Sequence, residues 1–138
     1  MNKPGEYVAI EFSSTDATTA ALVTLKDANQ ATRTLAANER LLIDDLFADL
    51  ATAVTSADMF SDTANTGTVD AGELIASFNP TSGEFEGGPE GYSIPVGVTP
   101  KVKAAVAGKV AISGVGRIVK GKSEGTRPSW RESQVPGK

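Results

Sequence analysis

The chain of 138 residues contains no cysteine and no histidine. The lack of cysteine excludes disulfides and thiolate metal sites. The lack of histidine excludes Ser-His-Asp and Cys-His nucleophiles, acid–base chemistry by imidazole, and the usual zinc sites. Carboxylate pairs and the chemistry of lysine and tyrosine remain open, but we expect a protein that is not an enzyme and needs no cofactor.

The sequence also lacks a run of about 18 apolar residues, so we expect no transmembrane helix. Its first residues, MNKPGEYVAIEF, contain no apolar stretch of the kind found in secretion signals. We therefore expect synthesis in the cytoplasm without processing, and no association with a membrane. With 40% apolar residues, the chain is long enough for one domain with one buried core.

Basic residues are scarce in the first 99 residues, which carry 15 acidic and 4 basic side chains, a formal charge of −11. Residues 100–138 carry 9 basic and 2 acidic side chains, a charge of +7, which leaves the whole chain at −4. A basic end of this kind predicts contact with something negative. That negative surface is either another molecule or the acidic part of the same chain, with basic strands lying beside acidic ones.

Short alternating segments dominate the chain. In residues 5–12, Val8 and Ile10 alternate with Tyr7 and Ala9, as in a strand with one buried face. Several short strands separated by turns predict an all-β protein, an antiparallel β-sandwich or jelly-roll-like barrel. Further strands are expected within 20–28, 73–79, 101–108 and 109–121, and loops or edge strands within the Gly- and Pro-rich range 83–100.

Residues 39–54, ERLLIDDLFADLATAV, do not fit this pattern. Their apolar side chains have helical spacing, and Asn38 is a possible N-cap, so periodicity alone predicts a helix. The many strands, glycines and threonines elsewhere in the chain argue against a helix. The sequence by itself leaves both alternatives open. The apolar positions with helical spacing are Leu42, Leu46, Phe47, Leu50 and Val54.

The stretch SDTANTGTVDAGE, residues 61–73, resembles a calcium-binding loop in its spacing. With Asp62 at position 1, Gly67 falls at position 6, Asp70 at 9 and Glu73 at 12, as a twelve-residue calcium loop requires. Position 3 is Ala64, which offers no ligand atom. The alternative is a tight loop without a metal, in which Gly67 adopts a positive φ and Asp62 or Asn65 caps backbone N–H groups. We favour this structural interpretation and expect no metal.

The last residues, KSEGTRPSWRESQVPGK, form a polar, basic tail without apolar periodicity. This composition is typical of a segment that is disordered in isolation. Trp130 lies between Arg127 and Arg131, which is also the composition of an interface anchor. We therefore divide the chain into an N-terminal arm over 1–6, a sandwich domain over 7–121 and a tail over 122–138.

Three segments together resemble the head decoration, or cement, proteins of tailed bacteriophages. They are TLAANERLLIDDL, MFSDTANTGTVDAGELIASF and VTPKVKAAVAGKVAISGVG, which occur in this order between residues 31 and 119. Proteins of that family commonly carry an acidic, glycine-containing segment in mid-chain, followed by a TPKV strand. This chain departs from the acidic pattern at Ala64 and Thr66, which argues against a metal role carried over from the family.

The resemblance implies a structural virion protein rather than an enzyme. It implies a β-sandwich, usually trimeric, that sits on the outer capsid surface and bridges neighbouring subunits of the major capsid protein. It also implies that residues 39–50 form a strand. We expect docking through the arm and the tail, with Arg127, Trp130 and Arg131 as contacts. The trimer interface is expected on an apolar sheet face that includes Leu46, Phe47 and Leu50.

Two other functions are compatible with the composition. A carbohydrate-binding or adhesive module would present exposed aromatic rings, for which only Tyr7, Tyr92 and Trp130 are available. Direct binding to nucleic acid is disfavoured, because the body of the chain is acidic and its basic residues are not interleaved with aromatic ones. The basic residues concerned are Lys101, Lys103, Lys109, Arg117, Lys120 and Lys122. The acidic group Asp44, Asp45 and Asp49 is interpreted as a solvated charged face.

Overall fold

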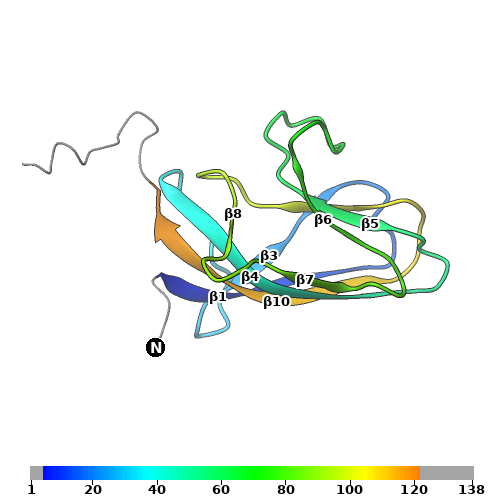
Figure 1. Ribbon diagram of the computed structural model, residues 1–138, viewed down its shortest axis with the longest axis horizontal. Coiled ribbons are helices and arrows are strands. Elements are labelled where there is room, and N and C mark those ends of the chain that lie inside the picture. The colour runs from blue at the N-terminus through cyan, green and yellow to red at the C-terminus, as the bar shows by residue number, and fades with distance from the viewer. Residues whose placement is uncertain (1–4, 122–138) are drawn as a thin grey trace, which may run out of the picture.

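The computed structural model describes residues 5–121, which form two antiparallel β-sheets packed face to face (Figure 1). The predicted all-β class and the antiparallel sandwich are therefore confirmed. This part of the chain contains no helix, and hence none long and apolar enough to cross a membrane. The predicted tail over 122–138 lies outside the described residues, as does the predicted arm except for Gly5 and Glu6.

The larger sheet has the strand order β3-β1-β10-β4-β7, and β8 also pairs with β4. Its strands are β1 (Glu6–Ser14), β3 (Thr24–Lys26), β4 (Glu39–Leu50), β7 (Glu84–Glu86), β8 (Tyr92–Ser93) and β10 (Val110–Lys120). The smaller sheet has the order β2-β9-β5-β6. Its strands are β2 (Ala21–Leu22), β5 (Ala57–Phe60), β6 (Leu74–Phe78) and β9 (Lys101–Ala104).

The core lies between the two sheets. It is formed by the side chains that point inward along each strand, which alternate with side chains that point outward. Val8 and Ile10 are buried on β1, as their alternation with Tyr7 and Ala9 predicts. Complete burial of one aliphatic side chain stabilises a fold by about 1.5–3 kcal/mol, so this layer dominates the stability. Other fully buried members include Leu41, Ile43 and Leu46 of β4, Met59 of β5 and Val102 of β9.

The strand expected within 20–28 is divided between the two sheets. Residues Ala21–Leu22 pair with β9 in the smaller sheet, and Thr24–Lys26 pair with β1 in the larger one. Val23, between them, is buried, and its N–H donates to the carbonyl of Pro100 at 3.0 Å. The alternation is continuous in the sequence because the chain stays extended while it crosses from one sheet to the other.

The helix that periodicity predicts over 39–54 is wrong, and the strand that the resemblance implies over 39–50 is correct. The reason is a β-bulge: the pairing of β4 with β10 skips Asp44, so that Val115 faces Asp45 while Gly116 faces Ile43. Leu41 and Ile43 point into the core before the bulge, and Leu46 and Leu50 after it. One extra residue changes the parity of the buried positions. The apparent helical spacing combines buried positions such as Leu46 with the exposed Phe47 on the opposite face of the strand.

A second bulge changes the expected pattern of β6. Simple alternation within the strand expected over 73–79 would place Leu74 on the same face as Ala76 and Phe78, but Leu74 is exposed and Ile75 is buried. The pairing of β5 with β6 shifts between Met59 and Phe60, so that Phe60 lies opposite Leu74. Ile75 is the extra residue of this bulge.

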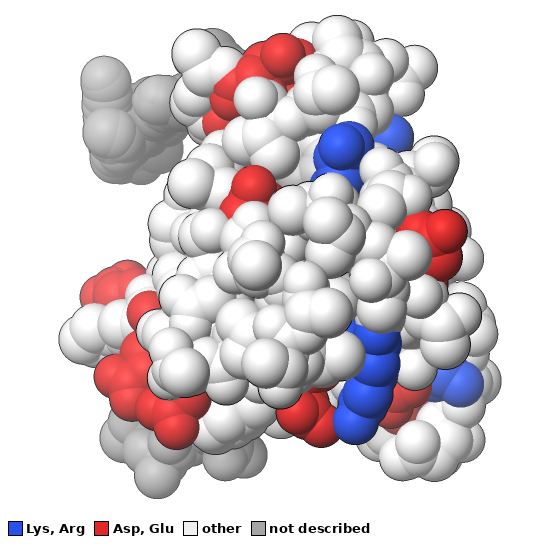
Figure 2. All heavy atoms as spheres, turned by 90° about the vertical axis from the view of Figure 1, so that its right-hand side faces the viewer, with Lys and Arg blue, Asp and Glu red and all other residues white. Residues whose placement is uncertain are grey.

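Both ends of the described chain lie at the same end of the sandwich, on the left in Figure 1. Glu6, the first residue of β1, pairs with Ile118 of β10, and Lys120 at the end of β10 pairs with Glu39 of β4. The arm and the tail therefore both begin at this end of the sandwich. Figure 2 views the opposite end, where several groups of acidic side chains are distributed over the surface, with Lys and Arg side chains beside some of them.

Candidate functional site

The acidic loop, residues 61–73, connects β5 to β6 and projects from the smaller sheet (Figure 1). It brings together the three carboxylates that the calcium-loop spacing selects, Asp62, Asp70 and Glu73. One oxygen from each lies within 4.8 Å of the others. The spacing in the sequence therefore predicts a real cluster in space.

Asp62 holds the first half of the acidic loop together. Its Oδ1 accepts a hydrogen bond from the backbone N–H of Thr66 at 3.0 Å, and its Oδ2 accepts one from Gly67 at 2.9 Å. Gly67 has a φ of 75°, and Asn65 has a φ of 56°. The tight loop with a capping Asp62 and a left-handed Gly67 is thus present as predicted.

Glu73 holds the second half in the same way. Its Oε2 accepts hydrogen bonds from the N–H of Ala64 at 3.0 Å and from the hydroxyl of Thr63 at 3.1 Å. Its Oε1 accepts one from the N–H of Asp70 at 3.0 Å. These donors, the backbone N–H groups first, lower the pKa of the Glu73 carboxyl.

Asp70 is bonded inside the loop as well, because the hydroxyl of Thr66 donates to its Oδ2 at 2.6 Å. All three carboxylates therefore already accept hydrogen bonds from the loop itself. These bonds explain how a segment of thirteen residues without regular secondary structure keeps a defined shape.

A lysine from another strand completes the cluster. The Nζ of Lys101, on β9, lies 2.8 Å from Oδ2 of Asp62, whose side chain is only 1% exposed. This ion pair, together with the loop N–H groups, lowers the pKa of the Asp62 carboxyl. Sequence reasoning did not link Lys101 to the loop, because 39 residues separate the two partners.

The acidic loop begins directly after a buried aromatic residue of the smaller sheet. Phe60 is completely buried, although it does not belong to the main core between the sheets. The pairing places Phe60 beside Lys101 on one neighbouring strand and Leu74 on the other, so the three share one face. Phe60 is thus buried at the point where the acidic loop leaves β5, beside the strand that carries Lys101.

This arrangement favours a structural role for the acidic loop. Calcium takes six to eight oxygen ligands, and its affinity rises with the number of ligand charges. Ala64 supplies no ligand at position 3, and the ammonium group of Lys101 lies directly beside Asp62. A calcium ion would have to displace this lysine.

A second charged cluster, around Arg33, lies at the end of the sandwich where the arm and the tail begin. Arg33 lies 3.0 Å from Glu6 and 2.8 Å from Glu39, and Lys120 lies 3.6 Å from Glu39. Hydrogen bonds from Arg33 and from the N–H of Ala36 lower the pKa of Glu39 to about 2. This cluster ties the first residue of β1 and the last of β10 to β4. No motif in the sequence predicts this charged cluster.

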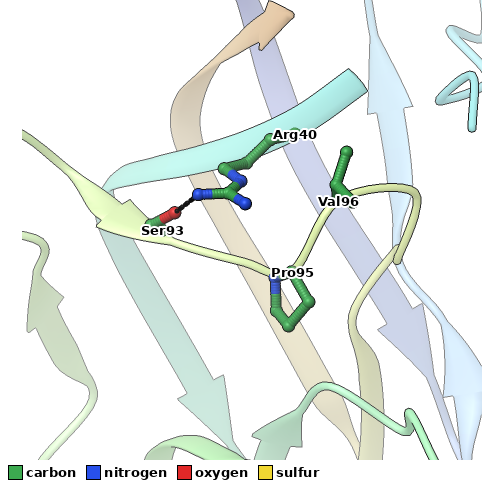
Figure 3. Close-up of a pocket in the computed structure, with 4 residues that line it drawn as sticks. All are labelled: Arg40, Ser93, Pro95 and Val96. Atoms are coloured by element: carbon green, nitrogen blue, oxygen red, sulfur yellow. Dashed lines mark hydrogen bonds between the residues drawn. The ribbon is translucent and has the colours of Figure 1, made fainter. Parts of the chain in front are cut away.

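Beside this cluster lies an open hollow of about 440 Å³, shown in Figure 3. Arg40 of β4 lines it, and its Nη1 donates to the hydroxyl of Ser93 at 3.2 Å. Pro95 and Val96, on the segment that follows β8, complete the lining. The hollow combines a guanidinium group with two apolar side chains near the start of the tail.

The expected trimer contacts need correction. Leu46 and Leu50 are buried core residues, because they lie on the inward face of β4 after the bulge. Phe47, between them, points outward and is 56% exposed, so it alone remains available for an interface. The docking candidates Arg127, Trp130 and Arg131 lie outside the described residues.

The acidic group on β4 is also not a uniform solvated face. Asp44 is buried at the bulge and forms a two-pronged ion pair with Arg117, with N–O distances of 2.9 and 2.8 Å. Asp49 is exposed and pairs with Lys109. The basic strand β10 thus lies beside acidic β4, as the intramolecular alternative for the basic end predicts.

The aromatic rings required by a carbohydrate-binding module are far apart in the sandwich. Tyr7 lies on β1 and Tyr92 on β8, with β10 and β4 between them. Three strand spacings correspond to about 14 Å, too far for both rings to stack on one sugar. Tyr92 packs edge-on against Phe85, with ring centroids 5.7 Å apart. Trp130 lies outside the described residues.

No protein-family model matches this chain, and no match was found among curated proteins or solved structures.

Proposed function

We propose that this protein is a capsid decoration protein: a structural component that binds the outer surface of a bacteriophage capsid and bridges neighbouring major capsid protein subunits. The proposal starts from the order and the amino-acid sequences of the three segments between residues 31 and 119 that resemble cement proteins. The all-β sandwich agrees with the architecture that this resemblance implies.

The strongest structural support for the proposal is the position at which the arm and the tail begin. The pairing of Glu6 with Ile118 and of Lys120 with Glu39 makes the arm and the tail begin side by side (Figure 1). A clamp needs its contact segments on one side, so that the rigid body can stand away from the surface it binds. Segments that become ordered on binding can cover a large area of a partner.

The mechanism we propose is geometric rather than chemical. A trimer at a local threefold position of the shell would present three arms and three tails to the surrounding subunits. Several weak contacts made together give high overall affinity, because each later contact forms at a high effective concentration. Within the tail, Trp130 would serve as the apolar anchor, while Arg127 and Arg131 would pair with shell carboxylates.

The experiment compares capsids with and without bound protein. We expect capsids saturated with the protein to release DNA at a higher temperature than undecorated capsids of the same phage. A variant that lacks residues 122–138 should lose this protection, whereas Leu22→Ser, on the far sheet, should retain it. Equal release temperatures for decorated and undecorated capsids would refute the proposal.

One observation favours the second candidate, a carbohydrate-binding module. A groove of about 690 Å³ on the outer side of the larger sheet is lined by a charged pair of residues and several hydroxyls. These groups can bond to sugar hydroxyls, and Phe12 is the one aromatic residue in the lining, which does not include Tyr7. Binding to a glycan array, lost in Glu11→Ala, would favour this candidate. The lining includes Glu11, Ser13, Thr24, Lys26, Thr32 and Ser113.

A further inference from the structure

The outer side of the larger sheet carries an exposed apolar centre. Strand register places Ala9 of β1, Val115 of β10 and Asp45 of β4 in one row, because directly paired residues point to the same side. The next row contains Glu11, Ser113 and Phe47. Phe47 is 56% exposed and Val115 is 45% exposed.

Four carboxylates surround this centre. Glu11 and Asp45 lie within the two rows, and Glu84 and Glu86 of β7 extend them, opposite Phe47 and Asp45. None of the four forms an ion pair with another of the described residues, and Lys26, beside Ala9, is the one basic side chain that register adds to these rows. We call this surface the acidic face. Its members are Ala9, Glu11, Asp45, Phe47, Glu84, Glu86 and Val115.

The described chain ends directly after the strand that crosses this surface, six positions after Val115. Gly121 follows β10, the strand that contributes Val115 to the acidic face. The seventeen residues beyond it carry four basic and two acidic side chains and the only tryptophan of the protein. In order, they contain Lys122, Glu124, Arg127, Trp130, Arg131, Glu132 and Lys138.

The charges and apolar groups of the two surfaces are complementary. On the acidic face, exposed apolar side chains lie among carboxylates, and in the tail an indole ring lies between two guanidinium groups. Cations such as arginine pair strongly with carboxylates, and an indole ring gains free energy by leaving water. Most basic side chains of residues 101–120 already have partners: Lys101 pairs with Asp62, Lys109 with Asp49, Arg117 with Asp44 and Lys120 with Glu39.

The tail is long enough to make this contact within its own chain. Val115 lies six positions before Gly121 on an extended strand, which corresponds to about 20 Å. Nine residues, 122–130, span up to about 30 Å when extended. A turn after β10 would therefore let Trp130 reach Phe47 and Val115.

We propose that in the free protein residues 122–138 bind the acidic face of their own chain, with Trp130 against Phe47 and Val115 and with Arg127 and Arg131 beside the surrounding carboxylates. This contact concerns the protein in the absence of any capsid, so it stands apart from the proposed function. If both hold, the acidic face competes with the capsid for the same tail.

The single tryptophan makes the contact measurable without a label, because all indole fluorescence comes from Trp130. In the full-length protein we expect blue-shifted emission and several-fold weaker quenching by acrylamide than in a synthetic peptide of residues 122–138. The double variant Phe47→Ser/Val115→Ser should emit and quench like the free peptide. Identical emission from the wild type and the free peptide would overturn the proposal.

Matched controls separate this contact from a general loss of structure. Leu22 is 57% exposed on the smaller sheet, so Leu22→Ser should leave the Trp130 signal unchanged. Arg127→Glu/Arg131→Glu leaves the sandwich sequence intact and should release the indole. A shift in Leu22→Ser equal to that of the double variant, or no shift in the arginine variant, would contradict the proposal.

A mixing experiment distinguishes the chain's own face from that of a neighbouring copy. The Phe47→Ser/Val115→Ser chain is refolded together with an excess of Trp130→Phe chains, which have an intact acidic face but no tryptophan. Emission should remain at the free-peptide value if each tail binds its own chain. Recovery of blue-shifted emission would show binding to a neighbour and overturn the assignment to the same chain.

Discussion

At Asp62, two backbone N–H groups and one ammonium group converge on a single buried carboxylate. The acidic residues of the loop thus act as internal acceptors, and Lys101 supplies the positive charge that balances them. At Asp44 the same principle applies inside the protein, where Arg117 provides the counter-ion at the bulge of β4. Both pairs join residues that are far apart in the sequence.

Replacement of Lys101 by methionine tests the internal counter-ion. The side chain keeps its apolar stem but loses its charge, so we expect a lower Tm than that of the wild type at pH 7. Because the pair lowers the pKa of Asp62, its contribution is complete above the ordinary aspartate pKa and disappears as the pH falls below it. The Tm difference should therefore shrink in acid. Lys103→Met, on the same strand, is the control, and an equal loss of Tm there would argue against a specific role of Lys101.

Asp44→Ala tests the buried pair. The change leaves the guanidinium group of Arg117 buried without its principal carboxylate, which costs about 3–5 kcal/mol of unfolding free energy. Asp45→Ala, the neighbouring residue on the outer side, should change the free energy by no more than about 0.5 kcal/mol. Urea unfolding of the two variants measures the difference. Similar midpoints would mean that the pair does not stabilise the fold.

At the scale of the elements, β4 and β10 form the centre of the larger sheet, and the chain must approach itself closely there. Gly114 of β10 lies between Ile10 and Leu46 on the inward side. A Cβ atom on Gly114 would lie 2.2 Å from the carbonyl oxygen of Asp45. Such a contact is with backbone, so side-chain rearrangement cannot relieve it.

Gly114→Ala should therefore destabilise the protein by about 1–3 kcal/mol or more. Ser113→Ala, one residue earlier and on the exposed side, should be nearly neutral. Thermal unfolding followed by circular dichroism compares the two. If Gly114→Ala has the Tm of the wild type, the close approach of β4 and β10 is not as described.

The second charged cluster, around Arg33, leads us to predict how stability depends on pH. Glu39 has a pKa of about 2 in the folded protein because Arg33 stabilises its charged form, against an ordinary value of 4.5. Its contribution to stability is thus complete above pH 4.5 and is lost as the pH falls toward 2. The Tm of the wild type should fall more steeply than that of Glu39→Gln over this range. Parallel curves for the two proteins would contradict this prediction.

The elements also show how far the sequence predicts the structure. Strands with simple alternation, such as β1 and β9, and the all-β class follow directly from the pattern of apolar residues. The two bulges, at Asp44 and at Ile75, could not be predicted, because each depends on which strand lies alongside. The acidic loop was identified by its own spacing, whereas its partner Lys101 depends on the sheet that brings β9 beside β5.

At the scale of the whole molecule, the charge asymmetry of the sequence is partly resolved by the fold. The basic residues within 101–120 mostly pair with carboxylates of the acidic body, which leaves the tail as the remaining basic segment. The arm and the tail begin at one end of the sandwich, next to strands of the larger sheet. The acidic loop connects two strands of the smaller sheet (Figure 1). The two segments that the proposed function uses as contacts therefore begin at the same end of the two-sheet body.

Binding to capsids tests this account most directly. Under the proposed function a tailed phage encodes the protein, so purified protein is mixed with mature capsids of that phage, and bound and free protein are separated on a density gradient. We predict that binding saturates at a fixed number of copies per capsid, a multiple of three set by the symmetry of the shell. Protein that remains at the top of the gradient at every concentration would contradict the account.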